Sequence, residues 1–185
     1  MTENKMQYAD RIAKAKKEWE DKPEAEKAQF LSGIANGVAA FLLWWDTLKA
    51  IEKKFNVEVM GIAREMRWKY GFERGQRMAK DFKEHGCKDL YDAYNAKFEG
   101  VVEAEWFECT DKCVHKWNYK CPCIQAFKDL GRTDEEIKEM APLYCLNDIA
   151  IMTGFNPKLE VFPQPRLIMR GDSHCVYRFE DHGGA

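Results

Sequence analysis

Hydrophobic residues in the first half of the chain recur at the spacing of an α-helix. After Pro23 they follow one another in steps of three and four, as Phe30, Leu31, Ile34, Val38, Phe41, Leu42, Trp45, Leu48 and Ile51. This spacing predicts a long amphipathic helix that buries one face. Residues 3–20, rich in Lys, Glu and Ala, predict a separate helix before it. A proline at the first helical turn marks the new start.

A third helix is expected over residues 58–84. Its core candidates are Ile62, Met66, Tyr70 and Phe72. Gly71 and Gly75 weaken this helix, and we expect them to mark the close approach of another element. Gly86 predicts the end of the helix, because glycine is the usual terminating residue.

Beyond residue 95 the pattern changes to the two-residue alternation of β-strands. Residues 96–109 and 113–119 predict a hairpin with its turn at 110–112. Helices are expected over 121–130 and, starting from a capping box at Thr133 and Glu136, over 133–152. The second of these is expected to break at Pro142 and to end at Gly154. Three short runs, 158–162, 166–170 and 174–179, predict returning strands.

Together these elements predict an α+β fold, in which a helical N-terminal half is followed by a small antiparallel sheet with packed helices. We place a helical region at residues 1–95 and an α+β region at residues 96–185. Both are expected within one compact domain, because 185 residues is an ordinary domain length.

Charge and composition narrow the classes of partner. The net charge is −2 and the pI about 6.1, so no basic surface for nucleic acid is expected. The apolar stretch 30–45 contains Ser32 and Asn36 and runs into Asp46. We therefore expect a buried helix and no membrane contact. The first residues lack the apolar run of a secretory signal, which predicts a cytoplasmic protein.

Seven cysteines in such a compartment are expected to be thiols rather than disulfides. Cys109, Cys113 and His115 are candidate metal ligands, because zinc prefers thiolate and imidazole donors. Cys121 and Cys123 follow them, but a single intervening residue is short for chelation of one metal by both sulfurs. The alternative is that several of these cysteines are small buried apolar side chains. A divalent metal is thus a candidate cofactor, and the sequence identifies no other.

A second group of candidate residues is spread more widely. It comprises Cys121, Cys145, Asp148, Asp172, His174 and Cys175. Cys145 and Asp148 are three residues apart, so on a helix they share one face. If the last strand lies beside the helix that opens at Cys121, three thiols would converge on one pocket. A helix N-terminus or a nearby histidine stabilises a thiolate, which is the nucleophilic form of cysteine.

Three segments in this region resemble the L-2-amino-thiazoline-4-carboxylic acid hydrolase family. They are CPCIQAFKDLG at 121–131, APLYCLNDIAIMTGFNPKLE at 141–160 and RLIMRGDSHCVYRFE at 166–180. The resemblance is strongest over residues 112–180 and rests on the order and spacing of the segments. It implies a hydrolase that opens a small cyclic amidine such as L-2-amino-thiazoline-4-carboxylate by C–N hydrolysis.

The reaction would begin with attack on the amidine carbon. In one hypothesis the thiolate of Cys175 or Cys121 attacks and His174 carries the proton. In another, cysteine with histidine or aspartate holds a metal that activates water. Both hypotheses place the chemistry among the same side chains.

Binding roles are assigned to the remaining candidates. Asp148 or Asp172 would pair with the amidinium, and Arg166 or Arg170 with the substrate carboxylate. Cys145 is a further candidate for substrate contact. The alternative function is a non-catalytic small-ligand or metal-binding protein, acting as a sensor or in redox chemistry. A homo-oligomer is also considered, with the Trp-rich helix at 30–51 as its interface.

Overall fold

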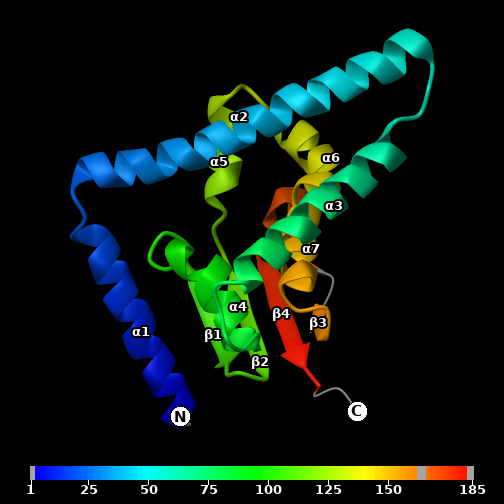
Figure 1. Ribbon diagram of the computed structural model, residues 1–185. Coiled ribbons are helices and arrows are strands. Elements are labelled where there is room, and N and C mark those ends of the chain that lie inside the picture. Colours follow the sequence, from blue (N-terminus) through cyan, green and yellow to red (C-terminus); the bar gives the residue numbers. More distant parts are fainter. Residues whose placement is uncertain (1–2, 162–165, 183–185) are drawn as a thin grey trace.

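A computed structural model describes residues 3–161 and 166–182 of the chain. Its N-terminal half is helical, with α1 (Glu3–Glu20), α2 (Glu24–Phe55), α3 (Met60–Ala79) and α4 (Cys87–Tyr94) (Figure 1). The break between α1 and α2 falls at Pro23, whose extended backbone precedes the first turn of α2. The expected restart after this proline is confirmed.

The long helix α2 buries the centre of its predicted apolar stripe. Val38, Phe41, Leu42 and Trp45 are buried, whereas Leu43 on the other side is 73% exposed. By length and composition α2 could also cross a membrane, and 22% of its most apolar window is buried inside the protein. The buried face packs on α5 and on the helices that follow it.

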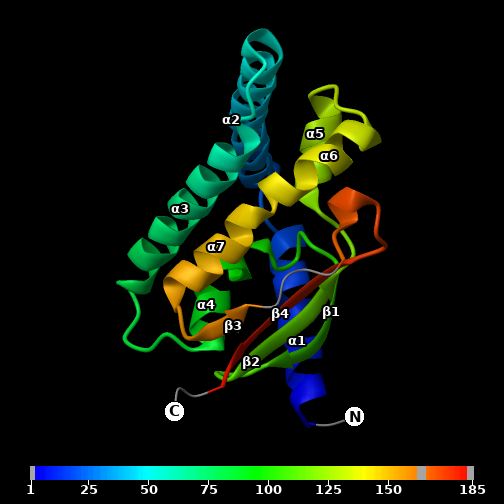
Figure 2. The ribbon, with the colours of Figure 1, turned by 90° about the vertical axis from the view of Figure 1, so that its right-hand side faces the viewer.

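Helix α3 packs against α7 (Leu146–Phe155) at unusually short range, and the two helices run side by side in both views (Figure 2). A Cβ on Gly75 would lie 2.1 Å from the carbonyl oxygen of Ile151, and one on Gly154 would lie 2.0 Å from that of Phe72. The close approach expected at the glycines is therefore confirmed. Gly154 lies within α7 and does not end it.

The prediction of which face of α3 is buried was wrong. Ile62, Met66 and Tyr70 are exposed, and the buried residues of this helix are Ala63, Gly71, Gly75 and Ala79. The reason is steric, because only the narrow side of the helix can approach α7 so closely. The helix is also shorter than expected at both ends, spanning Met60–Ala79.

A four-stranded antiparallel sheet forms the other layer. Its strands are β1 (Ala104–Cys109), β2 (Cys113–Asn118), β3 (Leu159–Val161) and β4 (Cys175–Asp181), in the order β1-β2-β4-β3. The predicted hairpin of β1 and β2 is confirmed, although a short 3-10 helix, Ala96–Phe98, replaces the start of its first strand. Of the run expected at 158–162, Phe162 lies outside the described residues.

The run at 166–170 is not a strand as expected. Ile168–Arg170 form a 3-10 turn, closed by Gly171 with a φ of 91°. The Asp172 carboxylate accepts a hydrogen bond of 2.8 Å from the Leu167 backbone N–H, which stabilises the turn. Local hydrogen bonding of this kind competes with strand pairing.

Three short helices connect the two parts of the sheet: α5 (Pro122–Asp129), α6 (Asp134–Tyr144) and α7. The predicted capping box is confirmed, because Thr133 Oγ1 accepts from Glu136 N–H while the Glu136 carboxylate accepts from Thr133 N–H. The expected break at Pro142 was wrong. Pro142 lies inside α6, and the chain changes direction at Cys145.

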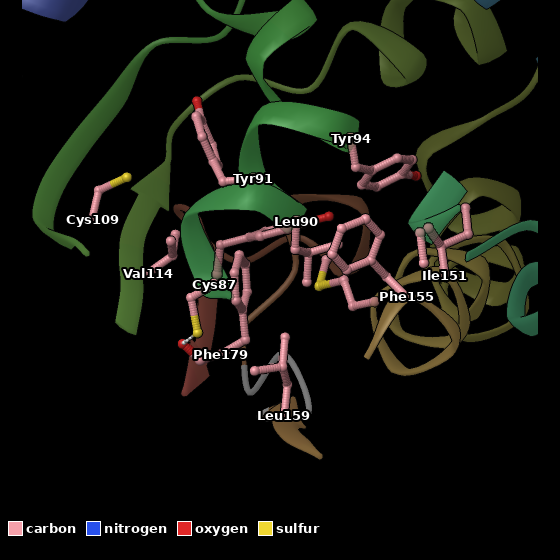
Figure 3. Close-up of a cluster of buried hydrophobic side chains, with 13 residues drawn as sticks. Cys87, Leu90, Tyr91, Tyr94, Cys109, Val114, Ile151, Phe155, Leu159 and Phe179 are labelled. Carbon is pink, nitrogen blue, oxygen red and sulfur yellow. Dashed lines mark hydrogen bonds between the residues drawn. The ribbon is translucent and has the colours of Figure 1, made fainter. Parts of the chain in front are cut away.

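The buried apolar side chains form two clusters. In the first, Cys87, Leu90 and Tyr91 of α4 pack on Val114 and Phe179 of the sheet, with α7 alongside (Figure 3). The second cluster joins α2 to α5, α6 and the 3-10 turn at 168–170. The described helices and the antiparallel sheet confirm the predicted α+β class. Helix α3 packs on α7, and α4 packs on β2, so segments before and after residue 95 are in contact.

Candidate functional site

A pocket of about 590 Å³ lies where the two apolar clusters meet. Its walls come from α2, α3, α4 and the helices after β2, and its floor comes from the inner face of β2 and β4. This volume falls within the range of about 300–1,000 Å³ that is usual for small-molecule sites. The pocket is the natural place to look for the chemistry of this protein.

The three thiols expected to converge all line this pocket. Cys121 precedes the first turn of α5, Cys145 joins α6 to α7, and Cys175 begins β4. Cys123, in the first turn of α5, lines it as well and accepts a hydrogen bond of 3.3 Å from the Tyr144 hydroxyl. All seven cysteines of the chain are present as thiols.

Most of the pocket thiols are held in the neutral form. Burial raises the pKa of Cys175, although the Ile168 N–H, 3.2 Å from its Sγ, opposes the change. Burial also raises the pKa of Cys145, whose Sγ donates to Met169 Sδ at 3.6 Å. A hydrogen bond with Cys121 and burial together raise the pKa of Cys123. A positively charged ligand would favour their thiolates, because an adjacent cation stabilises the anion.

Asp148 supplies the carboxylate of the pocket. Its Oδ1 accepts a hydrogen bond of 2.5 Å from the Tyr94 hydroxyl, and its Oδ2 accepts one of 3.3 Å from Tyr177. Burial raises the pKa of Asp148, while the two tyrosine hydroxyls act in the opposite direction. The carboxyl group is therefore fixed in orientation and can exchange a proton more readily than an exposed aspartate.

Basic residues that the sequence reasoning missed also line the pocket. Arg67 and Arg74 come from α3, Lys97 from the turn after α4, and Lys116 from the floor strand β2. Burial lowers the pKa of Lys116 to about 8, and rings of Tyr91, Trp106 and Tyr177 surround its amine. A signal for the arginines was present, because Arg67, Gly71 and Arg74 share one helical stripe.

His174 and Asp172 lie outside the pocket. His174 precedes β4 and stacks on Trp117, with ring centroids 4.4 Å apart, on the sheet face opposite Tyr177. Side chains alternate between the faces of a strand, so His174 and Cys175 point in opposite directions. The Asp172 carboxylate stabilises the 3-10 turn. The structure therefore turns His174 away from the thiols. Asp172 is not part of the pocket lining, but its charge acts on Cys175 and, with burial, raises the pKa of that thiol.

The two arginines expected to bind a carboxylate also lie apart from the pocket lining. Arg166 is exposed, and its carbonyl oxygen accepts from the Val176 N–H. Arg170 forms an ion pair of 3.8 Å with Asp172 beside the 3-10 turn. Arg67 and Arg74 line the pocket, so its basic side comes from α3, although the charge of Arg170 still acts to lower the pKa of Cys175, which burial raises.

The candidate metal ligands do not converge. Cys109 is buried and pairs with Val114 across the hairpin, whereas Cys113 and His115 lie on the other face of the same sheet. His115 packs against Phe107. Within residues 3–161 and 166–182, no three His, Cys, Asp or Glu side chains are grouped as metal ligands. The donor set proposed from the sequence therefore does not fit a common metal ion.

The pocket can do two things chemically with its own side chains. Its thiols can attack an electrophilic carbon once one of them is ionised. The one carboxylate among the described residues of its lining, held by Tyr94 and Tyr177, can pair with a cationic ligand group or carry a proton. The basic residues of α3 would attract an anionic ligand group to their side of the pocket.

Comparison with known proteins identifies one family. The family model described as L-2-amino-thiazoline-4-carboxylic acid hydrolase matches residues 39–179, which include α3, most of the sheet and every residue of the pocket from Arg67 to Tyr177. No curated protein and no solved structure matches the chain significantly. The family match covers most of the chain and is longer than the segment 112–180 expected from the sequence motifs. The chain therefore belongs to the L-2-amino-thiazoline-4-carboxylic acid hydrolase family.

Proposed function

We propose that this protein is a hydrolase that opens a small, carboxylated cyclic amidine of the 2-amino-thiazoline-4-carboxylate type by C–N hydrolysis. The observation that carries the proposal is the meeting of Cys121, Cys145, Cys175 and Asp148 in one pocket of a chain that belongs to this family. An amidine carbon is electrophilic, and the pocket offers thiol nucleophiles next to a carboxylate.

The proposed first step is attack by the thiol of Cys175 or Cys121 on the amidine carbon. A new C–S bond forms, the C–N bond to the ring nitrogen breaks, and that nitrogen takes up a proton. Water then attacks the same carbon, releases the carbamoyl product and returns the thiol. Atoms balance with one water consumed for each ring opened.

Asp148 takes the role of pairing with the amidinium in this proposal. A cationic ligand beside Asp148 would offset the burial that raises the pKa of Cys175, because it stabilises the thiolate. The proton released by the thiol can then pass to the departing nitrogen. His174 has no part in this scheme, because it lies on the other face of the sheet.

The test is product analysis with purified protein and L-2-amino-thiazoline-4-carboxylate. C–N cleavage releases a free α-amine, whereas cleavage of the bond to sulfur releases a free thiol, and amine and thiol reagents distinguish the two. We expect the amine. A thiol product would keep the hydrolase but overturn the C–N assignment. Binding without any ring opening would favour the alternative of a non-catalytic ligand-binding protein.

A further inference from the structure

Three residues that line the same pocket each carry a buried polar atom without a hydrogen-bond partner in the protein. The atoms are Nε of Arg67, Nδ2 of Asn95 and Oδ1 of Asn118. A buried donor or acceptor that stays unpaired destabilises the folded protein. These side chains lack partners within the protein, and a ligand in the cavity would supply polar groups to pair with them.

Arg67 is the most informative of the three. Its guanidinium packs over the rings of Phe41 and Tyr144, at 5.3 and 5.6 Å, and one terminal nitrogen donates to the Tyr144 carbonyl oxygen at 3.2 Å. Among the described residues, no carboxylate lies within 4.0 Å of it. Burial lowers the pKa of this guanidinium. The Asp148 carboxylate acts on this cation only from a distance, so no direct ion pair offsets its burial. The remaining donors of the guanidinium suit a planar carboxylate.

The two asparagines lie on the sheet side of the same pocket. Asn95 follows α4 and is only 5% exposed. Asn118 ends β2 directly opposite Cys175 in the strand pairing, and both residues line the pocket. Asn118 therefore lies beside the residue that carries the thiol, and its side-chain oxygen has no partner within the protein.

We propose that Arg67 binds the ligand carboxylate while Asn118 holds the nitrogen-bearing end of the ligand beside Cys175. Arg67 is thus a specificity-determining residue that selects small carboxylates and orients them toward the thiol. The inference rests on the proposed function for the identity of the ligand class.

Binding measurements can test this without turnover. The probes are L-thiazolidine-4-carboxylate, which has the ring and carboxylate but no amidine, and thiazolidine, which lacks the carboxylate. We expect Arg67→Met to weaken binding of the carboxylate at least tenfold and to leave thiazolidine binding unchanged. Arg64→Met, on an exposed position of the same helix, is the matched control and should bind both as the wild type does.

Unchanged carboxylate binding by Arg67→Met, or equal weakening by Arg64→Met, would overturn the inference. A purely structural role for Arg67 would instead lower the thermal stability of the ligand-free variant, whereas we expect no loss, because Met removes a buried charge. If Arg67→Met does not fold, carboxylate binding by Arg67→Lys tests the inference instead. It keeps the charge but loses Nε and the planar fork, so we expect at least threefold weaker carboxylate binding, and wild-type affinity would overturn the inference.

The outcome is separable from that of the proposed function. A wild-type protein that binds the carboxylate through Arg67 but never opens L-2-amino-thiazoline-4-carboxylate would contradict the hydrolase alone. Ring opening with an unchanged KM in Arg67→Met would contradict the role of Arg67 alone. Asn118→Ala adds a second reading, since it should weaken binding of both probes by removing an acceptor for the ring nitrogen.

Discussion

Tyr94 and Asp148, 54 residues apart in sequence, are joined by a hydrogen bond of 2.5 Å from the tyrosine hydroxyl to Oδ1. The bond connects the end of α4 to the first turn of α7 across the pocket. It fixes the only carboxylate among the described residues that line this pocket. The tyrosine hydroxyls that donate to Asp148 therefore affect both the position and the ionisation of its carboxylate.

Asp148→Asn should change how stability depends on pH. Burial raises the pKa of Asp148, so the folded protein holds this proton more tightly than the unfolded chain does. The stabilisation is fully present below the ordinary pKa of 3.8 and is lost as pH rises through the folded-state pKa. We expect the wild type to lose on the order of 1 kcal/mol relative to Asp148→Asn between pH 4 and 7. Urea unfolding across this range measures the difference, and parallel curves would contradict it.

Cys175→Ala and Cys121→Ser should abolish turnover while leaving the fold intact. Each variant removes a proposed nucleophile, and the loss of kcat should reach at least about 10³-fold for the residue that forms the covalent bond. The control is Cys113→Ser, because Cys113 lies on the other sheet face near Glu180. Circular dichroism checks the fold. Full activity in both pocket variants would show that the thiols do not carry the reaction.

Activity should rise with pH through the alkaline range. Burial raises the pKa of Cys175 above its usual 9.0, so more of the attacking thiolate forms as pH increases. A kcat/KM profile between pH 6 and 10 measures this in the free enzyme. A profile that is flat above pH 7 would argue for water, rather than the thiolate, as the attacking group.

Alanine at Gly75 and at Gly37 should have opposite effects on stability. A Cβ at Gly75 would meet the Ile151 carbonyl oxygen at 2.1 Å, so α3 and α7 must separate, at a cost of at least about 2 kcal/mol. A Cβ at Gly37 on α2 meets nothing within 4 Å. Alanine there should stabilise the helix by about 0.5–1 kcal/mol. Denaturant unfolding compares the two, and equal effects would contradict the tight contact.

Lys116→Met should make the protein more stable at neutral pH. Burial lowers the pKa of Lys116 from 10.5 to about 8, so the folded state binds this proton more weakly than the unfolded chain. The stability contributed by the neutral amine is present above pH 10.5 and is lost as pH falls to about 8. The loss is at most about 1.4 kcal/mol per unit of pKa difference, and the three rings around the amine offset part of it. A wild type that matches Lys116→Met at both pH 7 and pH 10 would contradict this.

The sequence predicted the elements whose signals are local. The break at Pro23, the capping box of Thr133 and Glu136, and the β1–β2 hairpin each depend on a few neighbouring residues, and the structure confirms all three. The face of α3 could not be predicted from apolar spacing. Its partner α7 requires small residues, so Gly71 and Gly75 are buried while Tyr70 is exposed.

Part of the candidate site could be predicted from helix starts and strand positions. These signals place four residues near one another: Cys121, Cys145, Asp148 and Cys175. Lys116 could not be placed, because its position depends on which face of β2 is buried. The helical stripe that Arg67 shares with Gly71 was a signal in the sequence, but it does not tell how α3 packs on α7. Adjacent residues such as His174 and Cys175 look like partners in a sequence, but a strand directs them to opposite faces.

The pocket lies between the two clusters of buried apolar side chains, with Tyr94 and Tyr177 from one and Tyr144 and Met169 from the other around it. A molecule bound there would touch both clusters at once. Binding would then stabilise both clusters together. We therefore expect the protein with its ligand to unfold in a single, sharper transition at a higher temperature. A bound ligand would thus fill the space between the two clusters and add to the packing of the core.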